Sequence, residues 1–133
     1  GVQGRGATLN GQPIHVSSVQ TMGESLLVTG FPYELKSVMR PLMHRFERCL
    51  MAAQGVRRLG SAALDLCYVA CGRFEGFWEQ LLKPWDTAAG ALIATEAGAA
   101  VTTFSGTPFS LNDKEILVTN GHIQGQMIEL LKL

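Results

Sequence analysis

Residues 83–90 read KPWDTAAG and residues 95–98 read TEAG, and these two stretches carry more information than any other part of the chain. A proline, a large aromatic and an acid open a run of small residues that favours a helix and closes on a glycine. Proline suits the first turn because its missing N–H would lack a partner there anyway. Asp86 then lies at or beside the N-cap, where the positive end of the helix stabilises a carboxylate. We expect Gly90 to let this helix approach a neighbouring backbone closely.

The carboxylate of Asp86 has two interpretations: it caps the helix, or it holds a metal ion. Capping is the commoner role of an acid at such a position, and the residues alone leave the choice open. A metal role requires further ligands, because Mg²⁺ is usually held by several oxygens in near-octahedral geometry.

Other stretches extend the pattern on the N-terminal side of residue 83. They read GRGATLNG at 4–11, TGFPY at 29–33, RRLGSAALDL at 57–66 and GRFEGFWE at 72–79. Together with the Trp-Asp-x-Ala-Ala-Gly stretch, they resemble the inositol monophosphatase family, the lithium-sensitive, magnesium-dependent phosphomonoesterases, and its bacterial branch in particular. The resemblance covers nearly the whole chain and is strongest from residue 56 to residue 98.

The resemblance implies roles for four residues. Asp86 falls on a metal ligand of the family, Glu79 on a carboxylate that accepts hydrogen bonds from substrate hydroxyls, and Ala62 on a backbone contact to the polyol, with Ser61 adjacent. A carboxylate suits a polyol because it only accepts hydrogen bonds, whereas the polyol offers several donors. On the residues alone, Glu79 is more often a solvated acid at a strand end, and Ser61 is an ordinary N-cap.

The chain departs from the family in one respect. The family's earlier half carries Asp-Pro-x-Asp-Gly-Thr, whose aspartates bind metal, and neither Asp-Pro nor Asp-Gly-Thr occurs here. The resemblance therefore implies a C-terminal half that has no complete catalytic set and needs Mg²⁺ ligands from a missing N-terminal half. Residues 1–16 are expected to be a hairpin from the end of that missing domain, and residues 17–133 a C-terminal α/β domain. The absence of an initiator Met agrees with a fragment.

Composition excludes several classes of protein. The 133 residues suit one domain, and 47% of them are hydrophobic against 17% charged. This apolar balance is compatible with a face that packs against another domain or subunit, and relatives are commonly dimers. The formal net charge is zero, so neither nucleic acid nor an anionic membrane is indicated as a partner. There is no apolar run of membrane-spanning length and no signal-peptide core.

The cysteines and histidines form no recognisable ligand set. Three cysteines, an odd number, indicate reduced thiols and a cytoplasmic location. Cys67 and Cys71 share a helical face and are expected to be buried as small apolar residues rather than bound to metal. The three histidines have no acidic or cysteine partner in a motif.

The pattern of elements predicts an α/β fold with a mixed, mainly parallel sheet and helices on both faces, the C-terminal domain of the family's α-β-α-β-α sandwich. A hairpin turns at Asn10-Gly11. Strands are expected at 25–29, 55–59, 74–78, 100–104 and 115–119. Helices are expected at 34–53, with a kink at Pro41, at 61–71 behind a Ser61 cap, at 84–98 and at 122–131.

Three polar residues beside the expected site remain unassigned. Arg57 and Arg58 suit phosphate, but they lie on an alternating strand, so at most one of them reaches the site. One of the two is expected to form an ion pair, within the chain or across a subunit interface, and neither is assigned to catalysis. Asp65 lies one helical turn beyond Ser61 and is expected to satisfy local polar groups.

The leading hypothesis is a magnesium-dependent hydrolase of inositol monophosphate or a similar small polyol phosphate. Fructose 1,6-bisphosphate, adenosine bisphosphate and histidinol phosphate, the substrates of related sugar and nucleotide phosphatases, remain open. The alternative is a non-catalytic regulatory or assembly module of the same fold, since bacterial relatives act through partner proteins in transcription.

Overall fold

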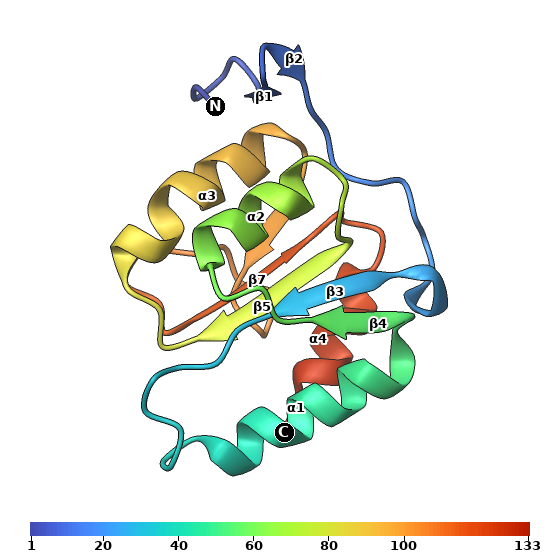
Figure 1. Ribbon diagram of the computed structural model, residues 1–133, viewed down its shortest axis with the longest axis vertical. Helices are drawn as coiled ribbons and strands as arrows, with labels where there is room; N and C mark the ends of the chain where they lie inside the picture. Colours follow the sequence, from blue (N-terminus) through green and yellow to red (C-terminus); the bar gives the residue numbers. More distant parts are fainter.

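The centre of the molecule is a five-stranded sheet in the order β4-β3-β5-β7-β6 (Figure 1). The computed structural model describes all residues from 1 to 133. β4 and β5 lie parallel to β3, whereas β7 is antiparallel to both β5 and β6. The strands are β3 (Leu26–Thr29), β4 (Gly55–Arg57), β5 (Gly76–Gln80), β6 (Ala100–Thr102) and β7 (Glu115–Thr119).

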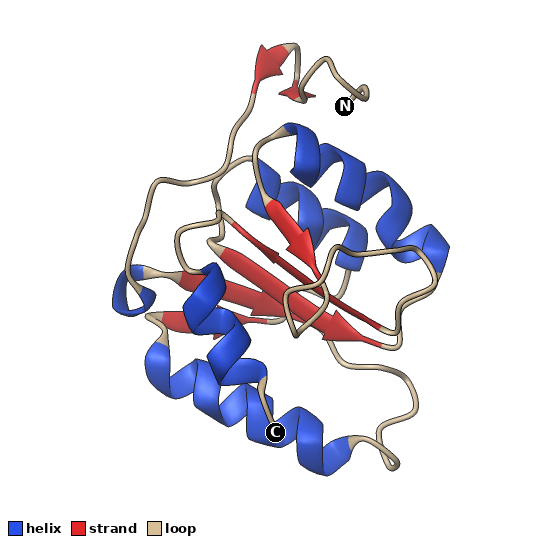
Figure 2. Cartoon of the chain, turned by 180° about the vertical axis from the view of Figure 1, so that it is seen from behind, coloured by secondary structure: helices blue, strands red, loops and turns tan.

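Two helices cover each face of this sheet (Figures 1 and 2). α2 (Ala62–Ala70) and α3 (Pro84–Glu96) pack together on one face, and α1 (Met39–Ala52) and α4 (Gln124–Leu131) on the other. Neighbouring residues of one strand serve opposite cores, because successive side chains of a strand point to opposite faces. Phe77 belongs to the core under α2 and α3, and Trp78 to the core under α1 and α4. This arrangement confirms the predicted mixed α/β sheet.

A small hairpin of β1 (Thr8–Leu9) and β2 (Gln12–Pro13) lies beyond the end of α3 (Figure 1). Asn10 and Gly11 both have positive φ angles, 52° and 80°, which a tight hairpin turn requires. The strands pair only with each other and are exposed, so the predicted hairpin is confirmed and its edges are open. The loop before β1 is fixed to α3, because the N–H groups of Gly4 and Gly6 donate to the Glu96 carboxylate at 2.6 and 3.0 Å.

The structure corrects several expectations about element boundaries. β4 ends at Arg57 and β6 at Thr102, each two residues before the predicted end, and α3 ends at Glu96 rather than at residue 98. α1 begins at Met39, so Pro41 lies in its first turn and causes no kink, because the N–H that proline lacks has no helical partner there. β5 begins at Gly76 and ends two residues beyond the predicted strand, so the observed strand includes Glu79.

The three thiols are free; Cys49 is buried, whereas Cys67 and Cys71 are only half-buried. Burial raises the pKa of Cys49 to about 12, so this thiol is unreactive at neutral pH. None of the helices combines the length and the apolar character that crossing a bilayer requires.

Candidate functional site

A cavity of about 780 Å³ lies where β3 and β5 end and α2 and α3 begin. Carboxyl ends of strands and N-termini of helices are the usual place for ligands in an open α/β sheet. The residues that line it come from four connections: Gly30, Phe31, Pro32, Tyr33 and Leu35 after β3; Arg58, Gly60, Ser61, Ala62 and Ala63 at the start of α2; Glu79, Leu81 and Leu82 from β5 and the residues after it; and Lys83, Trp85 and Asp86 at the start of α3. The four residues singled out in the sequence therefore share one cavity.

Asp86 is both a capping residue and a cavity residue. It is the third residue of α3, and its Oδ2 accepts a hydrogen bond from the backbone N–H of Lys83, the N-cap, at 2.9 Å. Its Oδ1 accepts no hydrogen bond, and the half-buried side chain lines the cavity. The two interpretations of this carboxylate therefore do not compete, because each uses a different oxygen.

Glu79 is held near the end of β5, with only 8% of the residue exposed. Burial, the largest cause, and the charges of Asp65 and Asp86 together raise the pKa of its carboxyl to about 7, against the opposing effect of Arg58. The carboxyl fits closely against Gly30, where a Cβ atom would overlap Oε1. Glu79 is therefore a buried group that is partly protonated at neutral pH, and the interpretation as a solvated surface acid is wrong.

Ser61 and Ala62 form the start of α2. Ser61 is the N-cap, and its Oγ accepts a hydrogen bond from the N–H of Leu64 at 3.3 Å. The preceding Gly60 has a φ of 91°, a left-handed conformation that favours glycine. This turn brings the first N–H groups of α2, which have no helical acceptor, to the cavity. Such groups favour anions and hydrogen-bond acceptors.

Asp65 behaves differently from the prediction. It is only 1% exposed, and neither of its carboxylate oxygens has a hydrogen-bond partner. Burial raises its pKa to about 6. The expectation that Asp65 satisfies local polar groups is wrong, because α2 carries it into the interior, where it acts on Glu79 by charge alone. One signal could have indicated this burial: an acid among the apolar residues of this helix.

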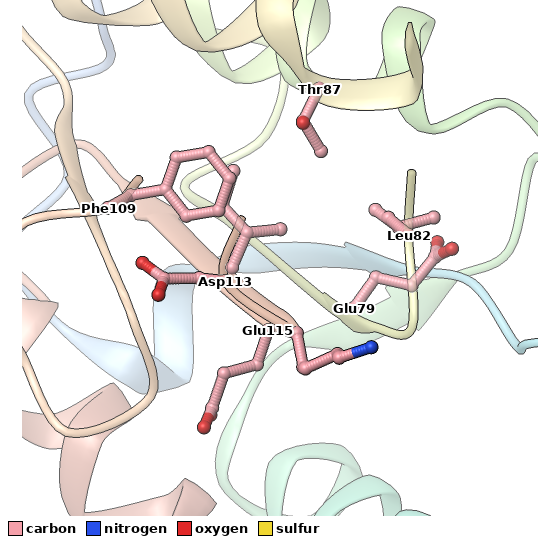
Figure 3. A pocket seen from close by; sticks show the side chains of 8 residues that line it. Glu79, Leu82, Thr87, Phe109, Asp113 and Glu115 are labelled. Atoms are coloured by element: carbon pink, nitrogen blue, oxygen red, sulfur yellow. The ribbon is translucent and has the colours of Figure 1, made fainter. Parts of the chain in front are cut away.

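A second hollow, between Glu79 and the β7 side, leaves no internal volume for a ligand. Figure 3 shows the Glu79 carboxyl beside Leu82, whereas the carboxyl groups of Asp113 and Glu115 point elsewhere. Those two acids have local roles: Asp113 accepts from the N–H of Ser110 at 2.7 Å, and Glu115 from the N–H of Phe104 at 3.2 Å. Of these two hollows, only the larger cavity has room for a ligand.

Two exposed aromatic side chains at this cavity were not assigned a role from the sequence. Tyr33 is fully exposed and Trp85 is 79% exposed, and both line the cavity. Large exposed apolar groups beside a cavity mark a surface that a ligand or another protein segment covers.

The residues present fit a divalent cation only in part. The free Oδ1 of Asp86 is a hard oxygen ligand of the kind that Mg²⁺ prefers. No group of three or more His, Cys, Asp or Glu side chains could hold a metal ion. The chain thus offers one carboxylate ligand and needs other oxygens to complete a site.

The fold and the cavity together define an α/β domain with a candidate ligand site at one edge of its sheet. The site combines the carboxylate of Asp86, the capped N-terminus of α2 and the Glu79 carboxyl that lies against Gly30. A model of the inositol monophosphatase family matches residues 1–132. The chain therefore belongs to this family, which confirms the resemblance seen in the sequence.

Individual relatives agree with this assignment. Over 126 residues the chain is 48% identical to a chloroplastic phosphatase of Arabidopsis thaliana, Phosphatase IMPL1, covering 95% of this chain and 34% of that protein. It is 43% identical to the Putative Nus factor SuhB of Neisseria meningitidis serogroup B, covering 97% of this chain and 49% of that protein.

Among solved structures, the inositol monophosphatase from Anabaena superposes with a TM-score of 0.94 at 44% identity, over 98% of this chain and 52% of that one. This superposition confirms the predicted fold class. The chain spans about half the length of the relatives it matches, or less.

Proposed function

We propose that this chain is the C-terminal part of a magnesium-dependent phosphomonoesterase that hydrolyses inositol monophosphate or a similar small polyol phosphate. One observation carries the proposal: Asp86, Glu79, Ser61 and Ala62, singled out separately along the sequence, line the same cavity. Membership of the inositol monophosphatase family supports the same reaction class.

In this proposal each residue has a distinct task. Oδ1 of Asp86 holds Mg²⁺, while Oδ2 keeps the side chain fixed to the N-cap of α3. Bound Mg²⁺ supplies Lewis-acid chemistry: it activates water and stabilises negative charge on phosphate oxygens. The N–H groups at Ser61 and Ala62 face the polyol or its phosphate.

Glu79 orients the polyol. Its ionised form accepts hydrogen bonds from substrate hydroxyls, and its protonated form both donates and accepts. Because its pKa lies near 7, both forms are available at neutral pH. The close fit against Gly30 holds the carboxyl in one place, which favours recognition of a defined hydroxyl pattern.

The chain by itself is proposed to be catalytically incomplete. Asp86 is one ligand, and magnesium requires several oxygens, which the resemblance assigns to an N-terminal half that carries Asp-Pro-x-Asp-Gly-Thr. The hairpin at residues 1–16 is proposed to belong to that half, and residues 17–133 to form the C-terminal domain. Lithium inhibition, dimer formation and a cytoplasmic location belong to the same proposal.

The decisive experiment measures magnesium-dependent hydrolysis of inositol monophosphate by the purified chain and by the full-length protein. We expect hydrolysis only from the full-length protein, with inhibition by lithium. Asp86→Asn should lower its turnover by about 100-fold or more, since it removes a charged metal ligand. Unchanged turnover in this variant would remove Asp86 from the mechanism, and strong activity of the chain alone would contradict its incompleteness.

Glu79→Gln tests substrate recognition. It should reduce kcat/KM for inositol monophosphate more than for p-nitrophenyl phosphate, an aryl phosphate that lacks the polyol hydroxyls. An equal loss on both substrates would argue against a recognition role.

A second candidate function is a non-catalytic regulatory or assembly role, and the match to a protein named Putative Nus factor SuhB favours it. The variant Asp86→Asn separates the two functions in the full-length protein. If the protein acts through assembly, this variant loses hydrolysis and keeps the complex with its partner, as measured by co-purification.

A further inference from the structure

The two neighbouring arginines before α2 lie in different surroundings. Arg57 is directed along its own strand, where its Nη1 donates to the carbonyl of Val56 at 3.4 Å. Arg58 lines the cavity, and its guanidinium carbon lies 5.1 Å from the centroid of the Phe31 ring. Only Arg58 lines the cavity, so at most one of the pair reaches the site, as expected. The expected reason is wrong, because β4 ends at Arg57 and Arg58 lies in the connection to α2 rather than on an alternating strand.

Arg58 is held in a defined orientation. The Phe31 ring beneath it also lines the cavity and meets Phe46 of α1 edge-on, with ring centroids 5.8 Å apart. When a guanidinium stacks on an aromatic ring, its N–H donors lie in the plane of the guanidinium and stay free to bind an acceptor. The stack of Arg58 on Phe31 thus presents donors to the cavity.

Those donors have no partner within the chain. Arg58 forms no hydrogen bond and no ion pair, since the one ion pair of the molecule joins Lys132 and Glu129. The side chain of Lys83 at the same cavity likewise has no acidic partner. Neither arginine forms an ion pair within the chain, so Arg58 is available to an anion, and an ion pair across a subunit interface stays a prediction.

The cavity acids neutralise this charge only in part, although Arg58 lowers the pKa of Glu79. Oδ2 of Asp86 is bound to the backbone of Lys83, and in the proposed function Oδ1 holds Mg²⁺. Glu79 carries only part of a negative charge at neutral pH, because burial and the carboxylates of Asp65 and Asp86 raise its pKa to about 7. A positive charge therefore remains where Arg58 lines the cavity, after β4.

We propose that Arg58 is a specificity-determining residue that binds a second anionic group of the substrate, a phosphate or a carboxylate, apart from the phosphate that is hydrolysed. The inference rests on the proposed function, which locates the scissile phosphate beside Asp86. Arg58 directly follows β4, whereas Asp86 lies in the first turn of α3, which is connected to the end of β5; β3 lies between β4 and β5. Two inter-strand spacings of ~4.8 Å separate the strand ends by about 10 Å. A cavity of about 780 Å³ accommodates a substrate with anionic groups at both ends.

The test uses matched substrate pairs with the full-length protein. Inositol 1-phosphate is compared with inositol 1,4-bisphosphate, and glycerol 2-phosphate with 2-phosphoglycerate, so that one pair adds a phosphate and the other a carboxylate. For each pair, the readout is kcat/KM for the substrate with two anionic groups divided by kcat/KM for the substrate with one. In Arg58→Gln this ratio should fall about 10-fold or more through KM, since a charge-assisted hydrogen bond is lost. The pair that responds identifies the anion.

The controls come from the same segment. Arg57→Gln removes an equal charge outside the cavity and should leave both ratios unchanged, and Arg58→Lys should restore part of the ratio because it keeps the charge without the planar donors. Phe31→Leu, which removes the stacking ring, should lower the ratio in the same direction as Arg58→Gln. Circular dichroism and melting temperature check that each variant is folded.

The outcomes distinguish this inference from the proposed function. Equal changes on both members of each pair, or no change, would overturn the role of Arg58, as would a wild-type protein that rejects both doubly anionic substrates. If the wild-type protein hydrolyses none of the four, the proposed function fails. In that case calorimetric titration with inositol 1,4-bisphosphate without magnesium still decides the role of Arg58, because Arg58→Gln must bind more weakly than Arg57→Gln.

Discussion

The first turns of α2 and α3 begin at the same cavity and each carries an aspartate, yet the two carboxylates lie in opposite surroundings. Asp86, the third residue of α3, is half-buried, faces the cavity and is bound to the N-cap backbone. Asp65, the fourth residue of α2, is buried without a hydrogen-bond partner. Neighbouring side chains of a helix point about 100° apart, so a side chain one position further along can point into the core instead of the cavity.

The fourth position is buried in both helices. Thr87, the fourth residue of α3, is 3% exposed, and Asp65 is 1% exposed. A neutral hydroxyl occupies this position in one helix and an acid in the other. The comparison shows that the position of a carboxylate in the first turn of the helix decides whether it faces the cavity or is buried. In α2 the buried carboxylate is that of Asp65, whose charge destabilises the fold and raises the pKa of Glu79.

The largest effect is expected where the two helices touch. A Cβ atom at position 90 would lie 2.6 Å from Cβ and Cδ1 of Leu66, so Gly90→Ala forces α3 away from α2. We expect the free energy of unfolding to fall by about 1–3 kcal/mol, as for other overpacked cores. Gly125→Ala in α4 is the matched control, since nothing lies within 4 Å of that position. If urea unfolding gave the same free energy of unfolding for both variants, α2 and α3 would be able to move apart without loss of stability.

Asp65→Asn should change stability in a pH-dependent way. The folded state binds the Asp65 proton more tightly than the unfolded state, with a pKa of about 6 against 3.8, so the free energy of unfolding falls as pH rises through this window. Replacing the acid should therefore raise the free energy of unfolding by about 1–2 kcal/mol at pH 8, and by much less at pH 4.

The same variant reports on Glu79. Since the Asp65 carboxylate raises the pKa of Glu79, Asp65→Asn should lower the pKa of Glu79. Denaturant unfolding at pH 4 and pH 8, with NMR titration of Glu79, measures both effects. A variant that is less stable at pH 8 than the wild type would mean that Asp65 has a partner and that its burial is favourable.

Asp86→Asn should have a smaller effect on stability, in the opposite direction. The amide oxygen can still accept from the N–H of Lys83, but the negative charge at the start of α3 is lost. We expect a loss of about 0.5 kcal/mol at pH 7 and low salt, since a charge near a helix terminus contributes this amount. Thermal unfolding at low and high salt tests this, because screening should remove the difference. A salt-independent loss of several kcal/mol would point to a structural role beyond capping.

Gly30→Ala should affect stability least. The added methyl group overlaps the Glu79 carboxyl, which is the far end of a flexible side chain, so Glu79 can change rotamer and the free energy of unfolding should fall by less than about 0.5 kcal/mol. The displacement should nevertheless shift the NMR signal of the Glu79 carboxyl and weaken discrimination between inositol monophosphate and p-nitrophenyl phosphate. Gly23→Ala, with open space around it, is the control. An unchanged Glu79 signal would show that Gly30 does not hold this side chain.

Local chemistry explains why most of the fold follows from the sequence. The Asn10-Gly11 turn, the Ser61 cap, the proline that opens α3 and the glycines that follow α2 and α3 each act within a few residues, and the structure has all of them. The misplaced start of α1 has the same origin, because the apolar spacing before Met39 is compatible with a helix that Pro41 then forces to begin late.

The sequence by itself determined the hairpin, the caps, the alternation of helices and strands, and the residue types of the proposed polyol phosphate site. Only the tertiary structure decided that Asp65 is buried without a partner, that Glu79 is a buried acid against Gly30, and that Arg58 rather than Arg57 faces the cavity. The physical reason is how far apart in the sequence the interacting residues lie. Caps and turns are set by hydrogen bonds between close neighbours in the chain, whereas burial and charge coupling depend on helices and strands that meet from distant parts of it.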